Sequence, residues 1–248
     1  MAVLVGILAV PACSARTDPD TGRIRVIFLG EYHGGNRQML EWIAAEPRFQ
    51  LTVVPCSLQD VPRIYAKRMT RLYIPRTYDL LRSSYDVIVF EDFGPMSLTN
   101  ANIENFRRSV EEEGLGLGLI EFANWQGTGS SYIDRWLATS IGEAFPAEVD
   151  LSTDVPASQG RTFYRILRKD PILNLPGIED VPMNAGHHGD ISPKPGSVVQ
   201  AEWRGRGTPV MVTGRYGNGP TLQLDHGWDN MPAEFRTCLL YTSPSPRD

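Results

Sequence analysis

Cysteine and clustered basic charge are scarce in this chain of 248 residues. Three cysteines are too few for the disulfide framework of a small secreted scaffold. The formal net charge is -5, and no run of Lys and Arg forms a stripe, so nucleic acid is not expected as a partner. The apolar run from Ala2 to Val10 is too short to cross a bilayer as a helix.

Motifs for metals and nucleotides are also missing. The sequence contains neither HExxH nor CxxC, and the adjacent pair His187-His188 in a Gly-flanked loop is more typical of a polar loop than of a metal site. The turn from Gly30 to Gly35 follows the first predicted strand but has neither the GxGxxG nor the GxxxxGK[ST] spacing. We therefore predict no metal and no cofactor.

The clearest pattern in the chain is a strand, a helix and a second strand. The apolar run from Val87 to Phe90 predicts a strand buried on both faces, with Glu91 and Asp92 at its carboxyl end. Thr99 is a helix start signal, and Gly114 ends the helix. Residues 117–120 predict a second buried strand that stops at Glu121. The unit predicts a parallel sheet with a right-handed crossover.

The flanking segments extend this pattern. Residues 24–29 and 49–54 predict strands on either side of a helix capped by Asn36. The basic and aromatic stretch 61–82 favours solvated helix faces with inward aromatic stems over a site for an anionic polymer. Short helices are predicted at 132–140 and 162–168. Beyond Ser197, alternation and Gly-rich turns predict antiparallel hairpins that end at Leu224.

The two ends of the chain are not expected to belong to the fold. Residues 1–22 resemble a secretory signal and tether, in which Val10-Pro11-Ala12-Cys13 is similar to a lipobox and Cys13 is the lipidation candidate. A buried N-terminal strand is the alternative. Residues 238–248 resemble a translated sequencing adapter, which leaves 23–237 as the domain. The expected location is extracytoplasmic, with a lipid anchor to the membrane, and the alternative is cytoplasmic.

Three stretches resemble the class I glutamine amidotransferase-like superfamily. They are Tyr85–Phe90, the glycine-flanked strand within 113–120, and the hairpin from Pro209 to Gly219. The resemblance implies an α/β, flavodoxin-like three-layer fold. It further implies a parallel sheet with helices on both faces and an antiparallel extension at the C-terminus.

Working amidotransferases of this superfamily carry a nucleophilic Cys on an elbow directly after the glycine-flanked strand. This chain has Glu121-Phe122-Ala123-Asn124 there, and Cys56 lies on a different predicted strand, where it is expected to be an ordinary thiol. The resemblance therefore implies the fold without glutaminase chemistry. A non-catalytic domain that binds a small polar ligand or a protein partner is the favoured hypothesis.

The predicted site lies at the carboxyl ends of the strands, where ligands bind in open α/β sheets. The alternative function is a hydrolase or lyase, with or without a metal, that uses carboxylates and imidazoles at the same edge. Its catalytic candidates are Glu31, His33, Glu91, Glu121 and His226. The candidates for ligand binding are Tyr32, Asp92, Asn124, Trp125 and Asp225.

Overall fold

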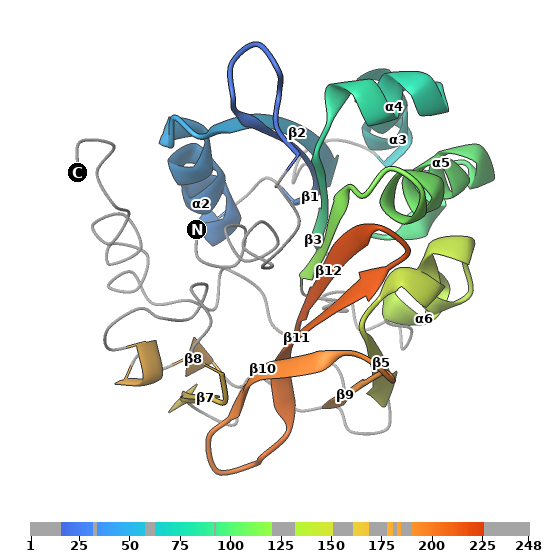
Figure 1. The fold of residues 1–248 in the computed structure, drawn as a ribbon. Coiled ribbons are helices and arrows are strands. Elements are labelled where there is room, and N and C mark those ends of the chain that lie inside the picture. The colour runs from blue at the N-terminus through green and yellow to red at the C-terminus, as the bar shows by residue number, and fades with distance from the viewer. Residues whose placement is uncertain are drawn as a thin grey trace.

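The computed structural model describes residues 16–31, 34–57, 63–91, 93–120, 132–150, 161–168, 178–180, 183–184 and 190–225. A twisted sheet runs through the molecule, with α2 on one face and α3 to α6 on the other (Figure 1). The first half contains β1 (Ile24–Glu31), α2 (Gly34–Ala45), β2 (Phe49–Ser57), α3 (Arg63–Tyr73), α4 (Tyr78–Ser84), β3 (Val87–Glu91), η1 (Pro95–Ser97), α5 (Asn100–Glu111) and β4 (Gly116–Ile120).

The second half is made of shorter elements and the C-terminal hairpins. The helical elements are α6 (Tyr132–Leu137), η2 (Ser140–Ala144) and η5 (Ile178–Asp180). The strands are β5 (Ala147–Asp150), β6 (Arg161–Thr162), β7 (Tyr164–Ile166), β8 (Met183–Asn184), β9 (Asp190–Pro193), β10 (Val198–Trp203), β11 (Pro209–Tyr216) and β12 (Gly219–Leu224).

The main sheet has eight strands in the order β2-β1-β3-β4-β12-β11-β10-β7. The first five strands of this order run parallel, because β1 pairs with β2 and β3, β3 pairs with β4, and β4 pairs with β12. From β12 onward the neighbours are antiparallel. The predicted fold class is confirmed: the sheet is mostly parallel, β3 is central, and the antiparallel strands extend it.

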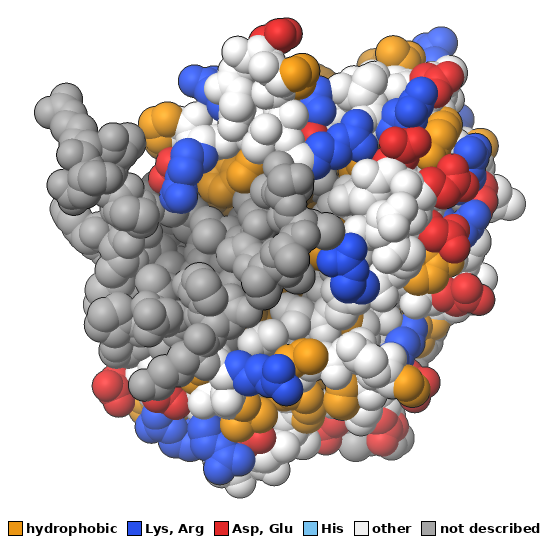
Figure 2. Space-filling model, viewed as in Figure 1, with side chains coloured by type: hydrophobic (Ala, Val, Ile, Leu, Met, Phe, Trp, Pro, Cys, Tyr) orange, Lys and Arg blue, Asp and Glu red, His pale blue; other side chains and the backbone are white. Residues whose placement is uncertain are grey.

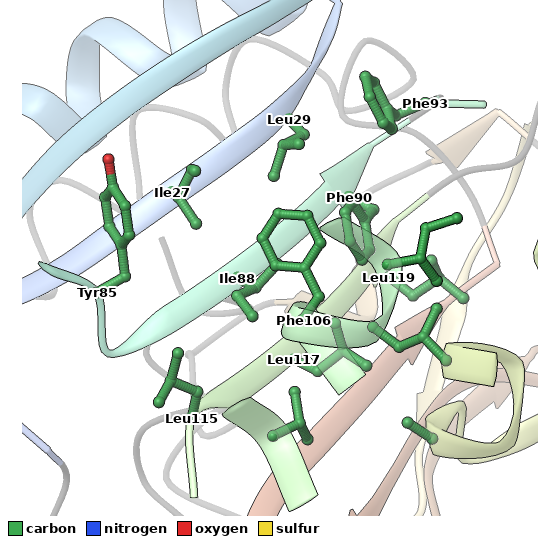
Figure 3. Packing of buried hydrophobic residues seen from close by; sticks show 14 of the residues in the cluster. Ile27, Leu29, Tyr85, Ile88, Phe90, Phe93, Phe106, Leu115, Leu117 and Leu119 are labelled. Carbon is green, nitrogen blue, oxygen red and sulfur yellow. The ribbon is translucent and has the colours of Figure 1, made fainter. Parts of the chain in front are cut away.

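Each face of the sheet has its own apolar core. On one face, Val26, Phe28, Val87 and Val89 pack against Leu40 and other residues of α2. On the opposite face, Ile27, Leu29, Ile88, Phe90, Leu117 and Leu119 pack against Phe106 of α5 (Figure 3). The rings of Phe90 and Phe106 meet edge to face with centroids 5.6 Å apart. All five residues of β3 are buried, as its continuous apolar sequence predicted.

Local signals explain where the central crossover helix begins and ends. The Thr99 side chain accepts a hydrogen bond from the backbone N–H of Asn102, and the Asn102 side chain accepts one from the backbone N–H of Thr99, which forms a capping box. Gly114 has a φ of 78°, a value that glycine adopts without a steric penalty, and it turns the chain back into β4. The predicted start of this helix is therefore confirmed, whereas the helix ends at Glu111 with Glu112 as its C-cap, two residues before the predicted Gly114.

A buried ion pair holds the amino ends of β1 and β3 together. The Asp86 carboxylate accepts hydrogen bonds from the backbone N–H of Arg25 at 2.9 Å, from Nε at 2.9 Å and from Nη2 at 2.8 Å. Arg16 Nε lies 3.6 Å from the same carboxylate. Asp86 is only 2% exposed. Its hydrogen bonds raise the pKa of the Arg25 guanidinium, which burial by itself would lower.

Three local predictions were wrong. Residues 162–168 form the end of β6 and then β7 instead of a helix, because Tyr164 and Ile166 pair with the edge of β10. Helix α2 begins at Gly34, so Asn36 lies inside it. Tyr65 and Tyr73 of α3 are exposed and do not pack inward, because Thr70 and Ile74 supply the inner face of that segment. Among the described residues no helix is long and apolar enough to cross a membrane.

Candidate site at the carboxyl edge of the sheet

The carboxyl ends of four neighbouring strands, β1, β3, β4 and β12, lie side by side at one edge of the sheet. Gly30 of β1 is paired with Glu91 of β3, and Glu91 is paired with Ile120 of β4. Ile120 is paired in turn with Leu224 of β12. At the usual strand spacing, Glu91 and Leu224 are roughly 10 Å apart. Asp225 is the next residue after this row.

The Gly30–Glu91 pair lies at the point where the strand order reverses. The chain passes from β1 outward to β2 and then returns to the other side of β1 to form β3. In open α/β sheets the crossover connections on the two sides of such a point leave a crevice outside the carboxyl ends, and this is where ligands bind. The structure therefore places Glu91 at the strand-order reversal, where the sequence predicted the site.

Glu91 is a fully buried carboxylate, with 0% of the residue exposed. It follows Val87 and Val89 at two-residue spacing, so its side chain leaves the sheet on the α2 face. Gly30 provides the room for it. A Cβ on Gly30 would lie 2.6 Å from the Phe28 ring, 2.7 Å from Glu91 Oε2 and 2.8 Å from the Glu91 carbonyl oxygen.

Asp225 is the second buried carboxyl group at this edge, 9% exposed. Its backbone N–H donates to the carbonyl of Val210 at 2.9 Å, which continues the pairing of β12 with β11. Its Oδ2 accepts a hydrogen bond from Trp203 Nε1 at 3.3 Å. Burial raises the pKa of Asp225 well above its usual value. The Trp203 hydrogen bond and Arg206 lower it, and Asp190 raises it further.

The surroundings of Asp225 include residues that the sequence did not single out. Trp203 ends β10 and packs against Tyr164 of β7, with ring centroids 5.5 Å apart. Arg206, in the turn after β10, forms an ion pair with Asp190 of β9 at 3.3 Å. These residues are far apart in the sequence, and the pairing of β7, β10, β11 and β12 brings Tyr164, Trp203 and Asp225 together. One feature of the sequence could have revealed this surrounding: the polar turn 204–208 joins β10 to β11 and lies at the same edge of the sheet as Asp225.

The environment of Asp225 predicts a pH dependence of stability. Because its folded-state pKa is raised, the folded protein binds more protons than the unfolded chain between about pH 4 and the raised pKa. This contribution to stability is therefore present at acid pH and is lost as the pH rises through that interval. Asp225→Asn keeps an oxygen for Trp203 but does not ionise. We expect the variant to be at least as stable as the wild type near pH 8, with a flatter stability profile.

Chemical denaturation at several pH values measures this difference. Asp79→Asn is the control, because Asp79 is an exposed carboxylate paired with Arg82 on α4 and does not act on Asp225. A wild-type profile that does not change when Asp225 is replaced would contradict the prediction.

The other candidates are placed in part or lie outside the described residues. The backbone of Glu31 ends β1 opposite Ser57, and that of Cys56 lies near the end of the edge strand β2. Among the described residues no group of three or more His, Cys, Asp and Glu side chains could hold a metal ion. The candidates outside the described residues are Cys13, Tyr32, His33, Asp92, Glu121, Asn124, Trp125 and His226, and the pair His187-His188 and the segment 238–248 lie outside them as well.

Comparisons with known proteins show the fold. No family model matches the chain, and no curated protein matches it. The structure is similar to Cytoplasmic Protein STM1381 from Salmonella typhimurium LT2, with a TM-score of 0.64 and 18% identity over 89% of this chain and 94% of that one. It is equally similar to Cytoplasmic Protein STM3548 from Salmonella typhimurium, with a TM-score of 0.64 and 17% identity over 88% of this chain and 98% of that one.

A third likeness is weaker. A β-galactosidase from Bacillus circulans sp. alkalophilus matches with a TM-score of 0.44 and 14% identity, over 90% of this chain and 31% of that one. At these identities the comparisons establish the α/β fold and do not extend to chemistry.

Proposed function

We propose that this chain is a non-catalytic, amidotransferase-like domain that binds a small polar ligand at the carboxyl edge of its sheet. The observation that supports the proposal most is the fully buried carboxylate of Glu91 at the strand-order reversal. Glu91 has an interaction partner within the protein, and buried ionisable groups of this kind gather at functional sites. Gly30 leaves room for this carboxylate where any other residue would fill the space.

The sequence after β4 supports the absence of glutaminase chemistry. In the resembled family the nucleophilic thiol follows the glycine-flanked strand, and here Ile120 is followed by Glu121. No cysteine occurs between Cys56 and Cys238. Acyl transfer requires an activated nucleophile, so binding is the function that the chain's own residues support.

The further parts of the proposal concern where the protein acts. Residues 1–22 would direct export, and Cys13 would carry a lipid anchor, so the ligand would be encountered outside the cytoplasm. Mass spectrometry of the protein purified from bacterial membranes checks this directly. A mature N-terminus at a diacylated Cys13 would support the proposal, and an intact Met1 in a cytosolic fraction would contradict it.

Ligand binding at Glu91 is tested by thermal denaturation against a panel of free amino acids, amines, polyols and monosaccharides. A ligand at a hundred times its Kd stabilises the folded state by about 2.7 kcal/mol. In a domain of this size we expect this to raise Tm by roughly 5–10 °C. Glu91→Gln should lose the shift, because the amide keeps the shape but not the charge.

The control for this experiment is Glu104→Gln, which changes a carboxylate on the surface of α5, away from the strand ends. It should keep the full ligand-induced shift. The binding proposal fails if no compound on the panel stabilises the wild type, or if Glu91→Gln responds as strongly as the wild type. Turnover of a compound that binds, lost in Glu91→Gln, would instead favour the hydrolase or lyase alternative.

A further inference from the structure

The outer surface of α3 and the start of α4 combines exposed apolar groups with unpaired positive charge. Between Val61 and Tyr78 the chain has five basic residues and no acidic one, in a protein whose net charge is -5. Leu72 is 74% exposed and Tyr65 53%, and Tyr73 and Leu80 are about half exposed. We call this surface the α3 face; its described members are Tyr65, Arg68, Arg71, Leu72, Tyr73, Arg76 and Leu80.

Its geometry follows from helical spacing. Thr70 and Ile74 are buried on the side of this segment that faces the fold, where α3 packs against β2. Tyr65, Arg68 and Leu72 follow one another at steps of three and four, so they share one outward stripe. The Arg68 guanidinium lies 5.9 Å from the centre of the Tyr65 ring. Within the described part of the chain, no acidic side chain forms an ion pair with Arg68, Arg71 or Arg76.

The neighbouring helices have a different kind of surface. On α5, Arg107 pairs with Glu104 and Glu111, and Arg108 pairs with Glu112. On α4, Arg82 pairs with Asp79 and Glu113. Basic and acidic side chains accordingly intermix on the right-hand side of Figure 2, where α4 and α5 lie in Figure 1. Asp79 lies next to Leu80 in the first turn of α4, but it is paired with Arg82. Within the described residues, the α3 face therefore differs from α4 and α5 in having arginines without an acidic ion-pair partner.

We propose that the α3 face docks onto an anionic phospholipid surface. Arginine heads would contact the phosphates, while Leu72, Leu80 and the two tyrosines would enter the interfacial layer, where amphipathic groups are stabilised. The exposed leucines favour a bilayer over an anionic polymer, because a polymer of phosphates or carboxylates has no apolar layer for them. This inference concerns a surface other than the ligand site and goes beyond the proposed ligand binding.

The N-terminal end of the described chain supports a phospholipid surface as the partner of the α3 face. Arg16 donates to the carbonyl of Arg82 in α4 and to that of Glu113 at 3.4 Å. The segment that carries the lipidation candidate therefore joins the domain beside α4. A lipid on Cys13 would be attached three residues before Arg16, and Arg16 contacts α4, the helix that contributes Leu80 to the α3 face.

The test is co-sedimentation of the unlipidated full chain with vesicles of phosphatidylcholine alone and of phosphatidylcholine mixed with phosphatidylglycerol. We expect binding to the anionic vesicles only, weakening as salt is added. Replacing Arg68, Arg71 and Arg76 together by Gln should weaken the partition about a hundredfold, since each basic residue near such a surface contributes about fivefold. Replacing Leu72 and Leu80 by Ser should weaken binding without changing its salt dependence.

The matched control replaces Arg23, Arg37 and Arg48 by Gln, which removes the same charge from other surfaces. It should change the partition by less than about threefold, because separated surface charges are screened. Equal losses in both triple variants would overturn the proposal, as would failure of the wild type to bind anionic vesicles at low salt. Competition with a polyglutamate peptide gives a further test. If the peptide binds the protein more tightly than the vesicles do and displaces it from them, the phospholipid proposal is overturned in favour of an acidic protein partner.

Discussion

Replacing Asp86 by alanine is expected to lower the free energy of unfolding by about 3–5 kcal/mol. The carboxylate is 2% exposed and receives three hydrogen bonds from Arg25. Its removal leaves the partly buried Arg25 guanidinium with the more distant Asp18 carboxylate, 3.7 Å away, as its acidic partner, and it leaves a backbone donor unsatisfied. Both effects are unfavourable. In a chain of this length the loss corresponds to a fall in Tm of roughly 6–20 °C.

Chemical denaturation with parallel calorimetry measures the effect. Glu41→Ala is the matched control, because it breaks an ion pair of similar length, 2.9 Å from Arg37, on the exposed side of α2. That change should cost less than about 0.5 kcal/mol. Asp86→Asn keeps one acceptor oxygen and should fall between the two. If Asp86→Ala and Glu41→Ala destabilise the protein equally, the ion pair between Arg25 and Asp86 does not hold the amino ends of β1 and β3 together as we infer.

The second large effect that we expect is an absence of glutamine hydrolysis. Loss of a nucleophile typically reduces the rate of such an enzyme by about 10⁶. In the superfamily that the chain resembles, the nucleophile follows the glycine-flanked strand, which is β4 in this protein, and the sequence after Ile120 reads Glu121 to Asn124. We therefore expect no ammonia release from glutamine by the purified protein and no labelling at the site by glutamine-analogue electrophiles.

Cys56 provides the internal check. Its backbone lies in β2 at the edge of the sheet, two strands from β3, so it is expected to react only as an ordinary thiol. The assay compares the wild type with Cys56→Ala. Substantial turnover that disappears in the variant would show that the elbow was assigned to the wrong strand, and the amidotransferase interpretation would then be restored.

The central part of the fold was predictable because its signals are local. The apolar run of β3, the Thr99 cap and Gly114 each act within a few residues. The parallel pairing of β12 with β4 was not predictable in this way. The hairpin of β11 and β12 has a local signature, but its partner is chosen by contacts about a hundred residues away. β6 and β7 were missed because strands of two and three residues are too short to show a period.

The candidate site was predictable to a similar degree. Glu91 and Asp225 were identified because a polar residue after a buried strand falls at the carboxyl edge, whatever the strand order. The sequence did not predict that Gly30 would face Glu91, because that depends on the register of β1 and β3. Nor did it predict the hydrogen bond from Trp203 to Asp225, which depends on the order of β10, β11 and β12.

The position of β12 between β4 and β11 has a consequence for how the protein is made. This strand is among the last parts of the domain to be synthesised, yet it joins the parallel and antiparallel parts of the sheet. A ribosome that has not reached Leu224 leaves β4 as an apolar edge strand, which can pair with another chain. The long sequence separation between β4 and β12 also favours slow folding. Nascent chains that end before Gly219 are thus the species most prone to aggregate, and chaperones that shield sheet edges would act on this protein late in its translation.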